Sequence, residues 1–182
     1  LSGLNEKRSL GKGEIIRPFL NLSKSDLEIF VHKNDLPFVE DDTNLNNDFD
    51  RNFLRNEIIP SLEKRWSKLP ERAALTSLTA KKKKLSLDFM LEKNFKKEIS
   101  TGIIERAKFI ETPSFLIEEL IRLILRKKGI ALPSQKVLSE IMNVFFHKKP
   151  SNESYVEWSR KDGEQIGGKV FSEHNDIILK KK

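Results

Sequence analysis

Cysteine is missing from this sequence of 182 residues. Without thiols the chain forms no disulfide framework and no thiolate metal site. Long apolar runs are missing too. Polar side chains interrupt every window of about 18 residues, so no transmembrane helix is expected. No secretory signal pattern opens the printed residues. We expect a cytoplasmic protein with no membrane partner.

The sequence also lacks the patterns of most metal and nucleophile sites. His32, His147 and His174 lie far apart and do not have the spacing of zinc ligands. No Ser-His-Asp arrangement is present, and no glycine-rich phosphate loop stands between a strand and a helix. These absences argue against a hydrolase triad and against a zinc centre.

One segment begins like a calcium-binding loop and then departs from it. Acidic and amide side chains alternate at Asp42, Asn44, Asn46 and Asp48. Such a loop requires glycine at its sixth position and glutamate at its twelfth, but Asn47 and Phe53 stand there. We therefore expect no metal bound by the chain itself.

What the sequence does contain is charge, and its distribution is uneven. Charged residues make up 34% of the chain, hydrophobic residues 37%, and the net charge is +7. Residues 1–66 hold 10 Lys/Arg against 12 Asp/Glu, whereas residues 67–182 hold 24 against 15. A basic half attracts polyanions such as RNA. The mildly acidic half is better suited to a site than to a clamp on a phosphate backbone.

The N-terminal part predicts a strand followed by helices. Residues 13–22 predict a short buried strand whose pairing ends at Pro18. Ser23 and Asp26 predict a helix N-cap. The next helix should begin near Asn47 or Asp48, and Pro60 permits only a break or a fresh first turn.

The C-terminal part predicts helices and then strands. Residues 70–97 predict one long helix, and residues 112–129 another, with Thr112 as cap, Pro113 in the first turn and Gly129 at the end. Ser134 caps a further helix that ends before Pro150. Three short β-type segments follow. The expected fold is mainly α, of the α+β class.

The densest pattern of charge lies in EDDTNLNNDFDRNFLRNEIIP, residues 40–60. Its first eleven residues hold five acids and no base, and Arg51 and Arg55 then share one helix face. Acids beside a helix start complement its dipole, and Arg55 is able to pair with Asp48 or Asp50 on the surface. That interpretation leaves unexplained why acids precede the helix and why arginines and asparagines crowd one segment.

The motifs of this region occur together and in order. They are RPFL (17–20), EDDTN (40–44), RNFLR (51–55) and IIP (58–60). Residues 14–66 strongly resemble the end of the N-terminal catalytic domain of bacterial tRNA(Ile)-lysidine synthetases. A weaker likeness continues through LPSQKVL and YVEW into the family's helical substrate-binding domain. That family often has an Arg-Tyr pair where this chain has Gly167-Gly168-Lys169.

The resemblance implies a domain layout. Residues 1–66 would be the C-terminal end of a doubly wound α/β nucleotide-binding domain of the PP-loop type. Residues 67–182 would be a helical tRNA-binding domain with a short β element at its C-terminus. The family's Ser-Gly-Gly-x-Asp-Ser ATP loop is not in these residues, so we expect it upstream of Leu1 and expect the chain to be inactive alone.

The resemblance also implies a reaction. The family uses ATP with Mg²⁺ to join free L-lysine to C2 of the wobble cytidine of tRNA(Ile) through an adenylated intermediate, which converts AUG to AUA decoding. Arg51, Arg55 and Asp42 are the expected catalytic residues, the arginines on phosphate or the activated base and Asp42 on the lysine amine. The other expected substrate-binding residues are Glu40, Asp41, Asn44 and Asn52. A homodimer is a further expectation.

Lysine-rich clusters of the basic half are expected to contact tRNA phosphates. They comprise Lys81, Lys82, Lys83, Lys84, Arg126, Lys127, Lys128, Lys148 and Lys149. Two alternatives stay open. One is a non-catalytic RNA-binding or adaptor module. The other is a different ATP-dependent tRNA-modifying enzyme of the same superfamily, although tRNA-thiolating members commonly need cysteines.

Overall fold

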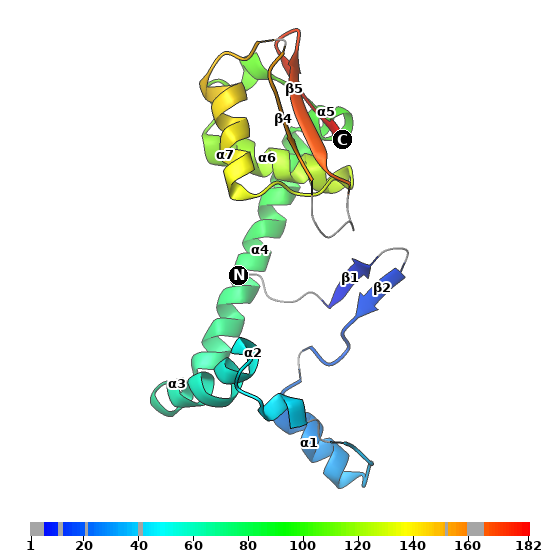
Figure 1. Ribbon diagram of the computed structural model, residues 1–182, viewed down its shortest axis with the longest axis vertical. Coiled ribbons are helices and arrows are strands. Elements are labelled where there is room, and N and C mark those ends of the chain that lie inside the picture. Colours follow the sequence, from blue (N-terminus) through cyan, green and yellow to red (C-terminus); the bar gives the residue numbers. More distant parts are fainter. Residues whose placement is uncertain (1–5, 11–12, 21, 40–41, 152, 160–165) are drawn as a thin grey trace. The chain divides into compact units, whose positions relative to one another are not determined.

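The computed structural model describes residues 6–10, 13–20, 22–39, 42–151, 153–159 and 166–182. By their packing the residues form two compact units, 1–83 and 84–182. Helices and two small sheets account for the fold in both units (Figure 1). Within the described ranges, no helix has the length and apolar character needed to cross a membrane.

The first unit begins with a hairpin. Strands β1 (Lys7–Leu10) and β2 (Gly13–Ile16) pair antiparallel, with Arg8 opposite Ile15. The strand predicted within residues 13–22 is present and its pairing stops before Pro18, but the prediction that it is buried is wrong, because no described residue of β2 is buried. A two-stranded hairpin offers no second layer to cover it, so its described side chains stay exposed or, at Ile15, half-buried.

Helix α1 (Lys24–Lys33) confirms the predicted cap. Ser23 Oγ accepts from the backbone N–H of Asp26 at 3.0 Å, and Asp26 Oδ2 accepts from the backbone N–H of Ser23 at 3.1 Å. This reciprocal pair satisfies two N–H groups that the first helical turn leaves without partners.

Residues 50–65 form three helical segments in direct succession. They are α2 (Asp50–Phe53), the π-helical segment η2 (Leu54–Ile58) and α3 (Ile59–Arg65), preceded by the 3₁₀ helix η1 (Asp42–Leu45). Pro60 stands in the first turn of α3 and has no N–H to donate to the preceding turn. The N–H of Ile59 instead reaches the carbonyl of Leu54, which gives the wider π turn.

The long helix α4 (Leu69–Asn94) matches the expected helix and spans the boundary between the units. The second unit continues with α5 (Lys96–Thr101), β3 (Ile103–Glu105), the 3₁₀ helix η3 (Arg106–Phe109), α6 (Ser114–Lys127), α7 (Gln135–Met142) and the π-helical η4 (Asn143–His147). Strands β4 (Tyr155–Trp158), β5 (Gly168–Glu173) and β6 (Asp176–Lys181) close the fold. These three confirm the predicted β segments.

Two predicted caps of the second unit have different outcomes. Ser134 caps α7 as expected, accepting from the N–H of Val137 at 3.3 Å. Thr112 does not cap α6: Pro113 occupies the N-cap position, and no side chain bonds the first turn. Pro113 has an extended backbone there, so the helix begins one residue later than the sequence predicted.

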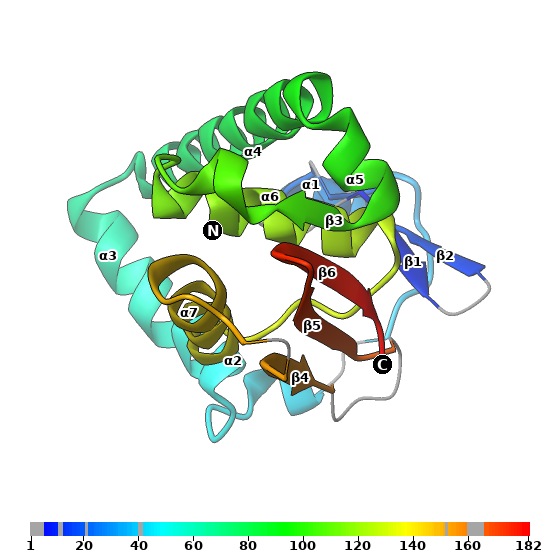
Figure 2. The ribbon, with the colours of Figure 1, turned by 90° about the horizontal axis from the view of Figure 1, so that it is seen from above.

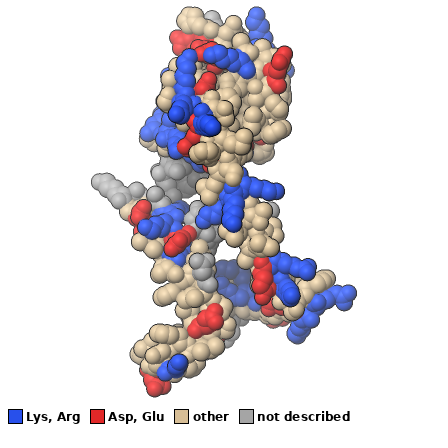
Figure 3. All heavy atoms as spheres, turned by 180° about the vertical axis from the view of Figure 1, so that it is seen from behind, with Lys and Arg blue, Asp and Glu red and all other residues tan. Residues whose placement is uncertain are grey.

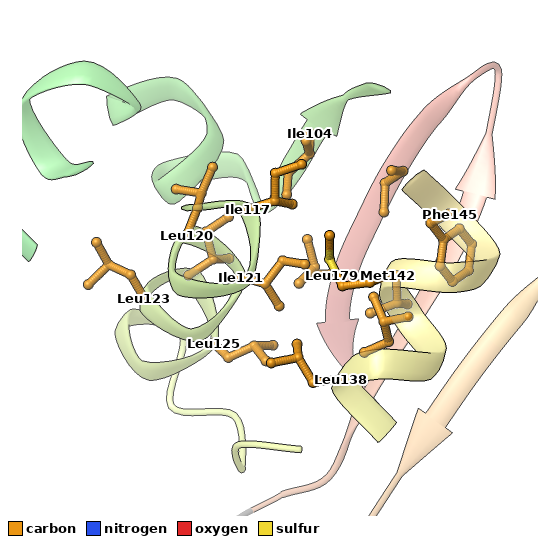
Figure 4. Close-up of a cluster of buried hydrophobic side chains, with 14 of the residues drawn as sticks. Ile104, Ile117, Leu120, Ile121, Leu123, Leu125, Leu138, Met142, Phe145 and Leu179 are labelled. Carbon is orange, nitrogen blue, oxygen red and sulfur yellow. The ribbon is translucent and has the colours of Figure 1, made fainter. Parts of the chain in front are cut away.

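The four-stranded sheet has the order β3-β6-β5-β4, with every neighbouring pair antiparallel. Figure 2 shows it beside α6 and α7. Alternate side chains of each strand point inward, among them Ile104, Val156, Val170 and Leu179. They belong to one cluster with Ile121 of α6 and Met142 of α7. Figure 4 shows Ile104 and Leu179 on the sheet side of this cluster. This layer of helix on sheet is the hydrophobic core.

The buried apolar side chains are confined to the second unit. All of those described lie between Leu91 and Leu179, whereas Asn52 is the one buried residue among the described part of residues 1–83. The first unit also exposes many large apolar side chains, including Phe19, Phe30 and Trp66. Its local order therefore depends on helix caps and side-chain hydrogen bonds more than on an apolar core.

Candidate functional site

The segment that the sequence singled out is organised around Asn52. This side chain is only 2% exposed, and its Nδ2 donates to the carbonyls of Thr43 and Asn46, each at 2.8 Å. The two bonds tie η1 and the following turn to the first turn of α2. Asn52 therefore holds the loop at residues 43–46 against the helix that carries the arginine pair.

The side chains of Asn46, Asn47 and Asn56 extend the same network. Asn56 Nδ2 donates to the carbonyl of Asn44 at 3.1 Å and to Oδ1 of Asn47 at 3.0 Å. The N–H of Asp48 donates to Oδ1 of Asn46 at 2.8 Å. Sequence reasoning did not select these three positions. The available signal was the spacing of Asn52 and Asn56, four apart on a helix, below a loop rich in asparagine.

The carbonyl end of the Asn52 side chain is unusual. Its Oδ1 is buried and has no hydrogen-bond partner among the residues that the structure describes. Buried side-chain oxygens nearly always accept a hydrogen bond, and leaving one without a donor costs about 1–3 kcal/mol. An acceptor held in this way is suited to a donor group supplied from outside the described residues.

Arg51 and Arg55 lie at the surface of this network. Both are exposed, Arg51 in α2 and Arg55 one turn later in the π segment. Among the residues that the structure places, neither forms an ion pair, and the pairs of Arg55 with Asp48 or Asp50 that surface capping would produce do not occur. Asp50 remains in the first turn of α2, where it complements the helix dipole.

The predicted acids of the loop are less fully described. Asp42 opens η1 and Asn44 is its third residue, with the Asn44 carbonyl bound by Asn56. Glu40 and Asp41 lie outside the described residues. The described segment therefore contains Asn44, Asn52, Arg51 and Arg55. The roles of Glu40 and Asp41 stay predictions.

The basic residues predicted to contact RNA lie in different surroundings. Lys81, Lys82 and Lys83 are exposed on α4, as are Lys148 and Lys149 after η4. Other members of the set bind acids or carbonyls of the second unit. Lys84 Nζ lies 3.0 Å from Asp88 and 2.6 Å from Glu119, and Arg126 bonds the same Asp88 at 2.9 Å.

Two more members of that set also have partners within the fold. Lys127 pairs with Glu92 at 2.7 Å, and Lys128 donates to the carbonyl of Ser100 at 3.1 Å. These contacts join α4 and α5 to α6. Half-exposed pairs contribute about 0–1 kcal/mol each, so they do not prevent a phosphate from competing for the cation. On the face drawn in Figure 3, basic and acidic side chains are correspondingly interspersed.

The described residues contain no group of three or more His, Asp or Glu side chains placed to hold a metal ion. Mg²⁺ was expected only together with ATP. Because no suitable donor set is present in the part of the chain that the structure covers, no role assigned below depends on that ion.

Comparison with known proteins places this geometry in context. A family model described as "PP-loop domain" (ATP_bind_3) matches residues 1–62, which include the Asn52 network and both arginines. A protein of Coxiella burnetii named "tRNA(Ile)-lysidine synthase" is 33% identical over 187 residues, covering 98% of this chain and 41% of that protein.

Further relatives carry the same name. One from Buchnera aphidicola subsp. Acyrthosiphon pisum is 34% identical over 158 residues, covering 86% of this chain and 36% of its own length. One from Actinobacillus pleuropneumoniae serotype 3 is 30% identical over 149 residues, covering 78% and 35%. The chain thus spans about two fifths of the length of the curated relatives it matches.

Proposed function

The chain is a relative of the tRNA(Ile)-lysidine synthases along nearly all of its own length, and on this basis we propose that the protein carrying it is an ATP-dependent ligase that joins L-lysine to the wobble cytidine of tRNA(Ile). Residues 1–66 would form the end of its doubly wound nucleotide-binding domain, consistent with the match to the PP-loop domain. Residues 67–182 would bind tRNA. The activity of the whole protein belongs to this proposal.

The reaction has two steps that place opposite charges side by side. The C2 oxygen of cytidine attacks the α-phosphorus of ATP, and pyrophosphate leaves. The ε-amine of lysine then attacks C2, loses a proton, and AMP leaves with the C2 oxygen. A site for this chemistry needs cationic groups for the phosphates and acceptors for the ammonium of the incoming lysine.

Arg51 and Arg55 are proposed to supply the cationic groups. The observation that carries the proposal is that both guanidinium groups are exposed, lie one helical turn apart and have no ion-pair partner within the described residues. Each guanidinium is able to bind a phosphate oxygen pair through parallel N–H donors. The asparagine network beneath them fixes the helix start from which both project.

The lysine amine is proposed to be held on the loop side of the same segment. Asp42 is the first candidate, with Glu40 and Asp41 beside it in sequence. The Oδ1 of Asn52, which accepts no hydrogen bond from any residue that the structure describes, offers a further acceptor for an N–H of lysine or of the base. Asn44 would contribute by fixing η1 through its carbonyl.

The proposal is tested with the protein as its gene encodes it. Incubation with ATP, radiolabelled lysine and the isoleucine tRNA should release pyrophosphate and place label on the RNA. A control tRNA with uridine at the wobble position lacks the amino-pyrimidine that the enzyme modifies and should acquire no label.

Other outcomes distinguish the alternatives. Pyrophosphate release without lysine transfer would indicate a different tRNA-modifying enzyme of the superfamily. Binding of tRNA with neither product would indicate an RNA-binding module. The names of the relatives favour the ligase over both.

A further inference from the structure

The outer face of the four-stranded sheet presents an ordered row of apolar side chains. Cross-strand register places Tyr155 opposite Phe171, Phe171 opposite Ile178, and Ile178 opposite Ile103. Tyr155 is 58% exposed and Ile103 36% exposed, although both belong to the sheet that covers the core on its other side. The row crosses all four strands and is not part of the site described above.

Charged side chains flank this row on both sides. On one side Lys169 lies opposite Lys180. On the other side Asp176 lies opposite both Glu173 and Glu105. Glu157 also lies opposite Lys169 and pairs with Lys182, and Lys97 and Lys108 both pair with Glu105. Lys169 and Lys180 are therefore the cations that this face offers to a phosphate.

The two lysines lie over the aromatic rings. Lys169 Nζ is 4.3 Å from the centre of the Tyr155 ring, and Lys180 Nζ is 4.6 Å from the centre of the Phe171 ring. Neither ammonium forms an ion pair with any acid that the structure describes, whereas nearby Lys182 is paired with Glu157. The rings and cations together line a shallow hollow of about 320 Å³, whose other walls are Glu153 and Ser154.

We propose that this face binds unpaired nucleotides of RNA, with bases stacked on Tyr155 and Phe171 and phosphates on Lys169 and Lys180. An exposed ammonium–ring contact is weaker than the stacking of a base on an aromatic side chain, so a base displaces the ammonium, which then reaches the adjoining phosphate. Four-stranded sheets with exposed aromatic residues use the same physical device for single-stranded RNA. An acidic peptide would use the lysines but leave the rings without partners.

The inference rests on the proposed function only in taking the RNA to be tRNA, whose loops and ends contain unpaired nucleotides. The binding surface itself is tested without catalysis. The probe is a fluorescein-labelled single-stranded RNA of ten mixed nucleotides, compared with a duplex of the same sequence. Anisotropy titrations at several salt concentrations use the full protein. We expect the single strand to bind more tightly than the duplex.

Ring-removing variants then identify the surface. Tyr155→Leu and Phe171→Leu keep apolar volume but remove the stacking faces, and each should weaken single-strand binding about 10-fold. Phe115→Leu is the matched control, because Phe115 is 70% exposed on α6 outside the sheet, and it should leave binding unchanged. Lys169→Ala with Lys180→Ala should lower the slope of log affinity against log salt by about 0.7 for each phosphate that the variant no longer binds.

Ultraviolet cross-linking provides a direct readout that does not depend on variant stability. Cross-linked peptides from the wild-type protein should contain Tyr155 or Phe171. Equal affinities for all three ring variants, or cross-links confined to other peptides, would overturn the inference. If the protein transfers lysine but its RNA affinity does not depend on Tyr155 and Phe171, the proposed ligase function holds and this binding surface is refuted. If RNA affinity depends on the two rings but no lysine is transferred, the surface holds and the ligase function is refuted.

Discussion

Arg55 lies in the π segment and forms no ion pair with any acid that the structure describes. The proposal gives it a bidentate contact with a phosphate or the activated base, which lysine does not reproduce. In the full protein, Arg55→Lys should lower the rate of lysidine formation about 100-fold, the usual effect of losing one preorganised donor. The melting temperature should change little, since the side chain is exposed.

Arg72→Lys serves as the control for Arg55→Lys, because Arg72 is also an exposed helical arginine without an ion pair in the described structure. Its turnover should stay near that of the wild type. Near-normal turnover in Arg55→Lys as well would assign this arginine to the solvated surface.

Asn52 makes its contribution through two donors. Asn52→Asp keeps the size of the side chain but turns an oxygen toward the carbonyls of Thr43 and Asn46. Removing each bond to a buried group costs about 1–3 kcal/mol, so the loop should detach from α2. Hydrogen exchange should accelerate at least about 10-fold across residues 43–48.

The control for the Asn52 experiment is Asn143→Asp, an exposed helical position with no side-chain bond in the described structure. It should leave exchange at residues 43–48 unchanged. Protection of that loop in Asn52→Asp would show that other contacts hold it.

Glu105 supplies a pH-dependent contact at the edge of the sheet. Hydrogen bonds from Lys108 and Lys97 lower the pKa of its carboxyl group from 4.5 to about 2. A lowered pKa in the folded state stabilises the fold above the unfolded pKa, and this contribution disappears as the pH falls from about 4.5 to about 2. The melting-temperature difference between wild type and Glu105→Gln should be present at pH 6 and close toward pH 2.

Glu111→Gln is the comparison for Glu105→Gln, because Glu111 is exposed and forms no ion pair among the placed residues. Its melting-temperature difference from wild type should stay constant over the same pH range. A melting-temperature difference between wild type and Glu105→Gln that persists at pH 2 would contradict the assignment of the two lysine contacts.

At the scale of elements, the join between β4 and β5 depends on glycine. A Cβ atom on Gly168 would overlap Cζ2 of Trp158 and lie 2.8 Å from Cγ2 of Ile130. Trp158 is itself fixed, since its indole N–H donates to the carbonyl of Ala131 at 2.6 Å. The close packing against Trp158 and Ile130 therefore explains the glycine at position 168.

Gly168→Ala should reduce the free energy of unfolding of the second unit by about 3 kcal/mol, the upper end of the usual cost of overpacking. It should also alter the near-ultraviolet circular dichroism contributed by Trp158. Gly129→Ala is the control: its φ of +63° costs backbone strain, but no atom lies within 4 Å of the added methyl. An unchanged Trp158 signal in Gly168→Ala would contradict the packing argument.

At the scale of the whole molecule, the surplus of positive charge and the described apolar core both belong to the later part of the chain. The basic residues concentrate after residue 66, and many of them pair with acids of the second unit. Lys81 and Lys83 have no ion pair within the described chain. If they bind tRNA phosphates, Lys81→Ala with Lys83→Ala should lower the slope of log affinity against log salt by about 0.9 for each phosphate released.

Lys136→Ala tests whether any surface lysine has this effect, because Lys136 is exposed on α7 and is not in the predicted RNA-contacting clusters. The slope of log affinity against log salt for Lys136→Ala should match that of the wild type within error. A slope that is unchanged by the α4 double variant would show that the lysine run is a solvated helix face.

Short-range chemistry in the sequence accounts for much of this protein. The Ser23–Asp26 cap, the Ser134 cap, the long helix through residues 69–94 and the three C-terminal strands all follow from rules of capping and periodicity. The motifs of residues 40–60 likewise identified the segment that the family comparisons cover. Such features are readable because each depends on residues a few positions apart.

Features that join distant residues became visible only in three dimensions. Three such features depend on which segments meet in space: the pairing of β1 with β2, the acids that bind Lys84 and Arg126, and the Trp158 packing that requires Gly168. The outer face of the sheet is the clearest case, because Tyr155, Phe171, Ile178 and Ile103 align only through strand order and register. Alternation along one strand specifies which side chains share a face, but not which strand lies beside it.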